Sequence, residues 1–213
     1  MPGFGGSGAI RAGIEPTARN LAAEVLAFAG SLGLGSVPGV AGISLGAWVA
    51  IECGRQDGAS GVVALCPAGF WKSPLPPRTG SAYELARLLR PLAPLLMKSR
   101  GLRTRALATN VHQPDKVPVS DAVALLRGYG GAEGYVESSR HMRASVIGDL
   151  SDLRVPLTIA WGEFDRLVRN KPLPADGLPP GARQVVLAGC GHIPTWDDPE
   201  QVARVILEGT EGP

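Results

Sequence analysis

Residues 42–46, with the sequence GISLG, are the feature that most constrains how this chain can fold. Residues 37–43 are mostly Val, Gly, Ala and Ile, which is typical of a short buried strand, and apolar residues follow at helical spacing over 47–53. A sharp strand-to-helix turn strains the backbone, and we expect the two flanking glycines because a side chain at either position would collide with the turn. Such a turn lifts the Ser44 hydroxyl clear of a sheet and points the first N–H groups of a helix at it.

Short apolar runs and amphipathic helical patterns alternate at both ends of the chain. The runs predict strands over 37–43, 61–66, 157–161 and 184–187, and the helical patterns cover 17–30, 47–54 and 199–207. Continuously apolar strands are typical of a parallel sheet that is covered on both faces. The pattern therefore predicts a doubly wound α/β fold, with a mostly parallel sheet and helices on both of its faces.

The middle of the chain has a different pattern, because residues 81–145 are helical throughout and carry no strand signal. We therefore divide the chain into a core of residues 1–70 and 146–213 and a helical insert of residues 71–145. A stripe of leucines runs from Leu85 to Leu96 within this insert. Amphipathic spacing of this kind predicts a helix packed on the core, rather than a surface that faces lipid.

Composition excludes several classes of function. Charged residues make up 19% of the 213 residues, the net charge is +2, and no dense basic run indicates a nucleic-acid partner. Cys53, Cys66 and Cys190 lack the spacing to histidine that a metal site needs, so we expect buried free thiols and no metal. With no bilayer-length apolar run and no leader pattern, we expect a cytoplasmic protein without a membrane partner.

A serine hydroxyl becomes a useful nucleophile only when a base accepts its proton and a carboxylate orients that base. Of the three histidines, His192 follows the last predicted strand in a small-residue context, whereas His112 and His141 lie inside the helical insert. Sites on open parallel sheets lie at the carboxyl ends of the strands. His192 is therefore the candidate base.

The acid is expected to follow a strand as well. Asp165 does so, directly after the predicted strand over 157–161 and its short turn. Glu163 is the competing carboxylate in that turn, and Asp197 and Asp198 are further candidates. The last two precede a helix, where carboxylates commonly cap the helix or favour its dipole. Asp165 is therefore the preferred acid.

The order Ser44, Asp165 and His192, each at a strand end, resembles that of the alpha/beta-hydrolase superfamily. Four segments in order carry the resemblance: residues 2–7 (PGFGGS), 42–46 (GISLG), 155–165 (VPLTIAWGEFD) and 189–194 (GCGHIP). They are similar to the family's loop after its fourth strand, its nucleophile elbow, its acid-bearing strand and turn, and its histidine loop.

The resemblance implies a serine hydrolase that works through an acyl-enzyme without a cofactor or metal. It implies that Ser44 is the nucleophile, that the Leu45 backbone N–H is one of the oxyanion donors, and that the insert forms a cap over the pocket. Phe70 and Trp71 follow the second strand, where the family commonly has residues that line the pocket. We expect a small-molecule substrate, namely a small, mostly apolar ester or a related carbonyl compound.

The chain departs from the family at its beginning. It starts at the loop that residues 2–7 resemble, so the resemblance places the family's first four strands and its His-Gly oxyanion loop outside this sequence. We therefore expect the strand over 37–43 to be an exposed sheet edge that favours a homo-oligomer. The alternative function is a hydrolase-fold binding protein, or an inactive truncated hydrolase, without turnover.

Overall fold

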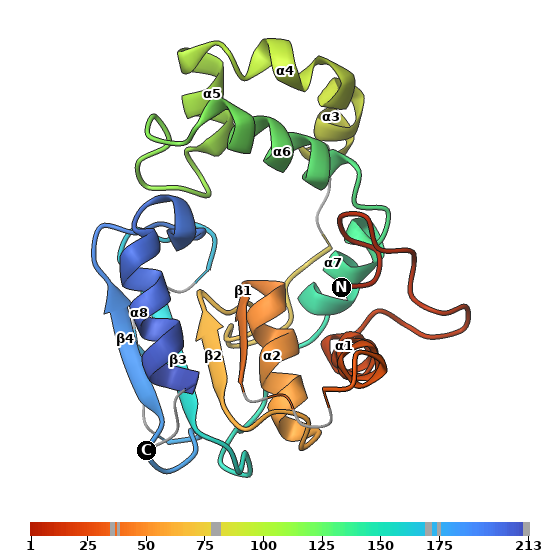
Figure 1. The fold of residues 1–213 in the computed structure, drawn as a ribbon, viewed down its shortest axis with the longest axis vertical. Coiled ribbons are helices and arrows are strands. Elements are labelled where there is room, and N and C mark those ends of the chain that lie inside the picture. The colour runs from red at the N-terminus through yellow and green to blue at the C-terminus, as the bar shows by residue number, and fades with distance from the viewer. Residues whose placement is uncertain (35–36, 38, 78–81, 169–171, 174–175, 211–213) are drawn as a thin grey trace.

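Four parallel strands form the sheet that the apolar runs predict (Figure 1). They are β1 (Val40–Ile43), β2 (Val62–Leu65), β3 (Leu157–Gly162) and β4 (Arg183–Leu187), and they lie in that order across the sheet. The computed structural model describes residues 1–34, 37, 39–77, 82–168, 172–173 and 176–210. The predicted fold class is confirmed.

The first strand is shorter than predicted. It begins at Val40, whereas Val37 makes only an isolated parallel bridge with Ala59, and Pro38 lies outside the described residues. β1 is also the edge strand of the described sheet, with β2 as its hydrogen-bonded neighbour. The other three strands begin and end within one residue of their predicted bounds.

Helices cover both faces of the sheet, as the continuous apolar character of the strands requires. Val62 and Ala64 of β2 pack in a cluster with α1 (Ala18–Ser31) and α2 (Leu45–Arg55). Val63 and Leu65 point to the other face and pack with Val202 and Val205 of α8 (Pro199–Thr210). Successive side chains of a strand alternate between faces, so β2 has to be apolar at every position.

The helical insert lies beyond the carboxyl ends of the strands (Figure 1). It contains α3 (Ala82–Leu89), the 3₁₀ turn η1 (Arg90–Leu92), α4 (Ala93–Leu96), α5 (Arg100–Leu107), α6 (Val119–Gly130) and α7 (Tyr135–Arg143), while Ser81 lies outside the described residues. The helix breaks near Pro91 and Pro94, because proline has no backbone N–H to continue the ladder. None of the described helices is long and apolar enough to cross a bilayer.

The leucine stripe is not packed on the core, so that prediction is wrong. The buried residues of α3 and α4 are Ala86 and Ala93, whereas four leucines of the stripe are exposed. A Cβ on Gly130 of α6 would lie 2.5 Å from the Ala86 carbonyl oxygen. The two helices therefore meet through small residues at close range, which leaves the leucines on the opposite side.

α7 belongs with the N-terminal part of the chain rather than with α3–α6 (Figure 1). The Gly134 N–H donates to the Gly3 carbonyl oxygen at 2.9 Å, and a Cβ on Gly3 would lie only 2.8 Å from the Gly134 Cα. Met142 packs against the cluster that contains α1 and α2. Gly3 thus allows the loop of residues 2–7 to contact the helical insert directly.

Candidate active site

Ser44 stands at the tight turn between β1 and α2. Its φ is 58° and its ψ is −118°, a region that few residues with a side chain occupy, so the predicted backbone strain is confirmed. The Ser44 N–H donates to the Leu65 carbonyl oxygen at 3.0 Å, and the Ser44 carbonyl oxygen accepts from the Ala68 N–H at 3.2 Å. These bonds attach the turn to the carboxyl end of β2.

The two glycines of the turn have different roles. A Cβ on Gly42 would lie 2.1 Å from the Gly46 carbonyl oxygen, so only glycine fits there. A Cβ on Gly46 would meet nothing within 4 Å. The expected collision is therefore confirmed at position 42 and wrong at position 46, because Gly46 lies in the first turn of α2 with open space beside it.

The Ser44 hydroxyl is available for chemistry. Although Ser44 is the N-cap residue of α2, its side chain makes no capping hydrogen bond. Leu45 is the first residue of α2, so its N–H is one of the helix's N-terminal donors. The positive end of the helix dipole lies at the same place, which favours negative charge near this turn.

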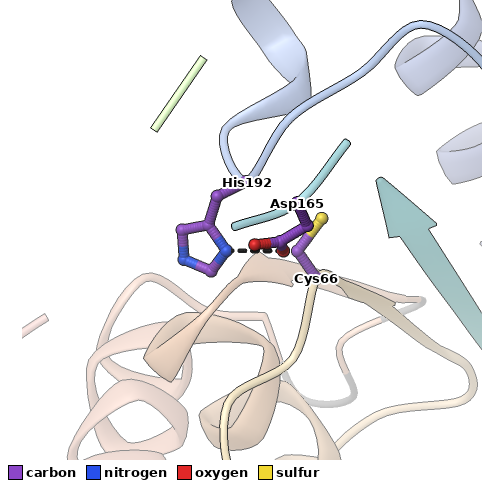
Figure 2. Close-up of side chains that lie close together, drawn as sticks. All are labelled: Cys66, Asp165 and His192. Carbon is purple, nitrogen blue, oxygen red and sulfur yellow. Dashed lines mark hydrogen bonds and ion pairs between the residues drawn. The ribbon is translucent and has the colours of Figure 1, made fainter. Parts of the chain in front are cut away.

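Asp165 and His192 are brought together by two different strand ends (Figure 2). His192 Nδ1 lies 2.8 Å from Asp165 Oδ2, and both side chains are buried. The second carboxyl oxygen, Oδ1, accepts the N–H groups of Leu167 at 2.8 Å and Val168 at 3.1 Å. With the carboxylate as acceptor, Nδ1 carries the proton, and Nε2 is left as the basic nitrogen.

Electrostatics keep the Asp165 carboxylate ionised. Burial raises its pKa, but the hydrogen bond and charge of His192, together with the N–H groups of Val168 and Leu167, outweigh burial and hold the pKa below its ordinary value. A charged, fixed carboxylate at Nδ1 is what orients an imidazole and stabilises its protonated form.

Ser44 is placed at the same edge of the sheet by its bonds to β2. In the described part of the structure no hydrogen bond joins its hydroxyl to His192. Catalytic hydrogen bonds are often long in an unliganded site and tighten when substrate binds. The sequence-predicted acid and base are therefore in contact, and the predicted nucleophile lies at the end of β1, which β2 separates from β3 in the sheet.

Two of the competing carboxylates have other partners. Glu163 Oε2 accepts the Gly189 N–H at 2.9 Å, and Asp198 Oδ1 accepts the Gln201 N–H at 2.8 Å in the first turn of α8. Asp198 therefore caps its helix, as expected for a carboxylate at that position.

Asp197 has a role that the sequence did not indicate. Its carboxylate accepts three backbone N–H groups, from His112 at 3.0 Å, Gln113 at 2.7 Å and Gly191 at 2.8 Å. The Ile193 N–H also donates to a carbonyl oxygen of the helical insert, at position 110. The residues on both sides of His192 are thus tied to the insert, through contacts that no local sequence pattern reveals.

Cys66 is a further member of the site that sequence spacing missed. It directly follows β2, its φ is 44°, and its sulfur, a carboxylate oxygen of Asp165 and a ring nitrogen of His192 lie within 4.8 Å of one another. In Figure 2 the carboxylate lies between the thiol and the imidazole. Burial, and then the charge of Asp165, raise the pKa of the Cys66 thiol.

These three side chains are of the types that bind metal ions. In this structure the Asp165 carboxylate is hydrogen-bonded to Nδ1 of His192, and burial raises the pKa of the neighbouring Cys66 thiol. The cluster as described is a hydrogen-bonded Asp–His pair with a protonated thiol beside it.

A cavity of about 240 Å³ lies beside the acid turn. Phe70 and Trp71, the predicted pocket residues, line it together with Pro67, Leu75, Leu167 and Val168. The last two residues also donate their N–H groups to Asp165, so the cavity wall and the acid share one turn. The cavity is small and its lining side chains are apolar.

Fold and site geometry together define an α/β protein with a buried, hydrogen-bonded Asp–His pair at the carboxyl edge of a parallel sheet. Residues 1–205 match the alpha/beta hydrolase family, and the chain belongs to that family.

Individual proteins of known name share less than 30% of their residues with this chain in the three comparisons that follow. The chain is 29% identical over 194 residues to epoxide hydrolase EphH of Mycobacterium tuberculosis, covering 81% of this chain and 85% of that protein. Its fold is similar to that of a thermophilic esterase from Thermogutta terrifontis, with a TM-score of 0.66 and 20% identity over 98% of this chain and 76% of that one. An enol-lactonase from Burkholderia xenovorans gives a TM-score of 0.61 and 19% identity over 98% and 77%. At these identities the two solved structures show only that the folds are similar.

Proposed function

We propose that the protein is a serine hydrolase with Ser44 as nucleophile, His192 as base and Asp165 as the acid that orients it. The 2.8 Å contact between His192 Nδ1 and Asp165 Oδ2 carries the proposal, because it leaves Nε2 as the proton acceptor. The strained turn at Ser44, whose hydroxyl does not cap its own helix, supports the nucleophile.

The reaction would proceed in two halves. Ser44 Oγ attacks the ester carbonyl carbon while Nε2 of His192 takes the hydroxyl proton, and that proton then passes to the departing alcohol. Water attacks the acyl-enzyme in the second half, again giving a proton to Nε2, and the acid product leaves as Ser44 regains its hydrogen. The Leu45 N–H would stabilise the oxyanion in both halves.

Acyl transfer suits a hydroxyl at position 44 better than epoxide opening does. An alkoxide that opens an epoxide forms an ether, which water does not cleave under ordinary conditions, so the enzyme would stop after one event. A carboxylate nucleophile would form an ester that water can hydrolyse. The name of the mycobacterial relative therefore does not carry over to a chain with Ser44.

The cavity supports a small apolar substrate. Its volume of about 240 Å³ is below the common range for sites of drug-sized ligands, roughly 300–1,000 Å³. Phe70 and Trp71 offer aromatic walls. The proposal therefore specifies a short-chain ester or a related carbonyl compound.

We also propose that the protein works in a reducing compartment such as the cytoplasm, because the three cysteines are free.

Labelling with a fluorophosphonate, which reacts with activated serines, tests the proposal. We expect the wild type and Ser73→Ala, a matched change at an exposed serine, to be labelled and to hydrolyse p-nitrophenyl acetate and butyrate. Ser44→Ala should lose the label and nearly all hydrolysis. If the folded wild type takes no label and Ser44→Ala hydrolyses the esters equally well, the enzyme proposal is wrong.

That second outcome would favour the alternative, a binding protein on a hydrolase fold. One observation supports this alternative: the Ser44 hydroxyl and His192 are not hydrogen-bonded in the described structure. A pure binder, however, has no need for a charged carboxylate fixed on Nδ1 of a histidine.

A further inference from the structure

Four leucines of the stripe form an exposed apolar surface on the helical insert. Leu85 and Leu88 lie one turn apart in α3, and Leu92 of η1 and Leu95 of α4 follow them along the chain. We call this set the exposed leucine stripe: Leu85 (54% exposed), Leu88 (73%), Leu92 (49%) and Leu95 (69%).

These leucines are not needed to hold the insert together. α3 contacts α6 through Ala86 and Gly130, and Met97 belongs to a separate buried cluster with Ala122 of α6. α3 and α4 lie farther from the sheet than α6 does (Figure 1). The stripe is therefore an apolar surface on the outer layer of the molecule.

The stripe lies among basic residues. Residues 82–107 contain six basic side chains and one acidic one. Five of the six are exposed: Arg87, Arg90, Lys98, Arg100 and Arg105. The one acid, Glu84, lies 3.8 Å from Arg87, and outside the segment Asp115 pairs with Arg100 at 3.2 Å. Arg90 lies with its guanidinium close to Gly131 at the end of α6. After these contacts are discounted, Lys98 and Arg105 remain as exposed cations of the segment without an ion pair among the described residues, and the segment keeps a positive excess.

We propose that the exposed leucine stripe docks on an anionic phospholipid surface. The leucines enter the boundary between headgroups and acyl chains, while the surrounding arginines and lysine contact the lipid phosphates. The expectation of no membrane partner rested on the lack of a bilayer-length apolar run, and docking on a membrane surface needs no such run. The segment lies on a membrane without crossing it.

Charge distinguishes this partner from a second copy of the chain. If two copies met through the same stripe, each would bring its cations against those of the other, and like charges at an interface oppose association. A negatively charged lipid surface offers the opposite sign over the whole patch. The inference goes beyond the proposed function and does not depend on it, because lipid docking requires no turnover.

Vesicle co-sedimentation tests the docking. The intact chain is mixed with vesicles of phosphatidylcholine alone or with about 30% phosphatidylglycerol, and the partition coefficient is measured. We expect binding to the anionic vesicles, reduced by at least about tenfold in Leu88→Glu/Leu95→Glu. The matched control Phe28→Glu/Leu207→Glu replaces two exposed apolar residues elsewhere and should bind like the wild type.

The cations are tested separately. Lys98→Gln/Arg105→Gln should lower binding to the anionic vesicles by about tenfold, and added salt should weaken wild-type binding. Circular dichroism and the unfolding midpoint verify that each variant is folded.

Three results would overturn the proposal. The wild type could fail to bind anionic vesicles, it could bind phosphatidylcholine alone equally well, or the leucine variant could bind as tightly as the control. If the leucine substitutions instead convert a wild-type dimer into a monomer in light scattering, while no vesicles bind, the partner is a second copy. All of these readouts are independent of Ser44 labelling.

Discussion

Each oxygen of the Asp165 carboxylate has a separate task. Oδ2 holds the His192 ring, and Oδ1 holds the N–H groups of Leu167 and Val168, whose residues line the cavity. One side chain thus fixes both the proposed base and a wall of the cavity. A carboxylate is required, because no other side chain accepts hydrogen bonds from so many donors and also carries the negative charge that stabilises a protonated imidazole.

The lowered pKa of Asp165 predicts how stability depends on pH. The native pKa lies below its ordinary value of 3.8, so the ionised group contributes stability above that value, and the contribution is lost as the pH falls through the native pKa. We expect wild type to exceed Asp165→Asn in free energy of unfolding by a constant margin above about pH 5, with a smaller margin in more acidic solution.

Urea unfolding of both proteins across this pH range measures the margin. Glu163→Gln, which changes the neighbouring carboxylate, is the control and should show no comparable loss in acid. A margin that stays constant down to about pH 2 would contradict the charged state assigned to Asp165.

At the scale of elements, the turn between β1 and α2 depends on one of its two glycines. A methyl group on Gly42 would overlap the Gly46 carbonyl group, whereas a methyl group on Gly46 enters open space. We expect Gly42→Ala to lower the free energy of unfolding by about 3 kcal/mol or more. Gly46→Ala should be neutral or stabilise by up to about 1 kcal/mol, because alanine is the better helix former. Equal effects in urea unfolding would show that the turn is not as tight as described.

Asp197 connects the loop that carries His192 to the helical insert. Its carboxylate accepts the N–H groups of His112 and Gln113 in the insert and of Gly191 in the loop. Removing its carboxylate leaves three backbone N–H groups without their acceptor, so Asp197→Ala should cost about 2–4 kcal/mol in unfolding. If the protein hydrolyses esters as proposed, displacement of His192 should also lower kcat at least about tenfold.

The neighbouring Asp198 offers a matched control. It caps α8 and does not hold the histidine loop, so Asp198→Ala should cost about 1 kcal/mol of stability and leave kcat unchanged. If both variants lose activity to the same degree, Asp197 has no special role in positioning the histidine.

At the scale of the whole molecule, β1 is an edge of the described sheet. An edge strand offers unpaired N–H and carbonyl groups to another chain, and charged side chains commonly block such pairing. The Ala41 side chain is exposed on this strand. We propose that β1 promotes self-association of the chain, and we expect Ala41→Lys to reduce it.

Light scattering after size exclusion at several concentrations measures the association. Ala27→Lys adds the same charge at an exposed position of α1 and should leave the mass distribution unchanged. A wild type that stays monomeric at every concentration would rule out the edge as an interface between copies.

Local patterns were enough to predict the four strands, the carboxyl ends that carry the polar residues, and the contact between Asp165 and His192. Ser44, Asp165 and His192 each follow an apolar run, and parallel strands bring their carboxyl ends to one edge whatever the rest of the chain does. The contact between Asp165 and His192 could thus be expected from the order of strands and polar residues along the chain, because backbone geometry alone brings it about.

Other features were decided only by the tertiary structure. Cys66 lies beside Asp165 because β2 and β3 are neighbours, and Asp197 reaches the insert because two distant loops pack together. The leucine spacing indicated an amphipathic helix correctly, but it could not tell which side is buried. Packing through Ala86 and Gly130 settled that, since close contact of small residues turned the leucines outward. The sequence by itself therefore determined the strands and their end residues, and the tertiary packing decided which side chains support the site and which face the surroundings.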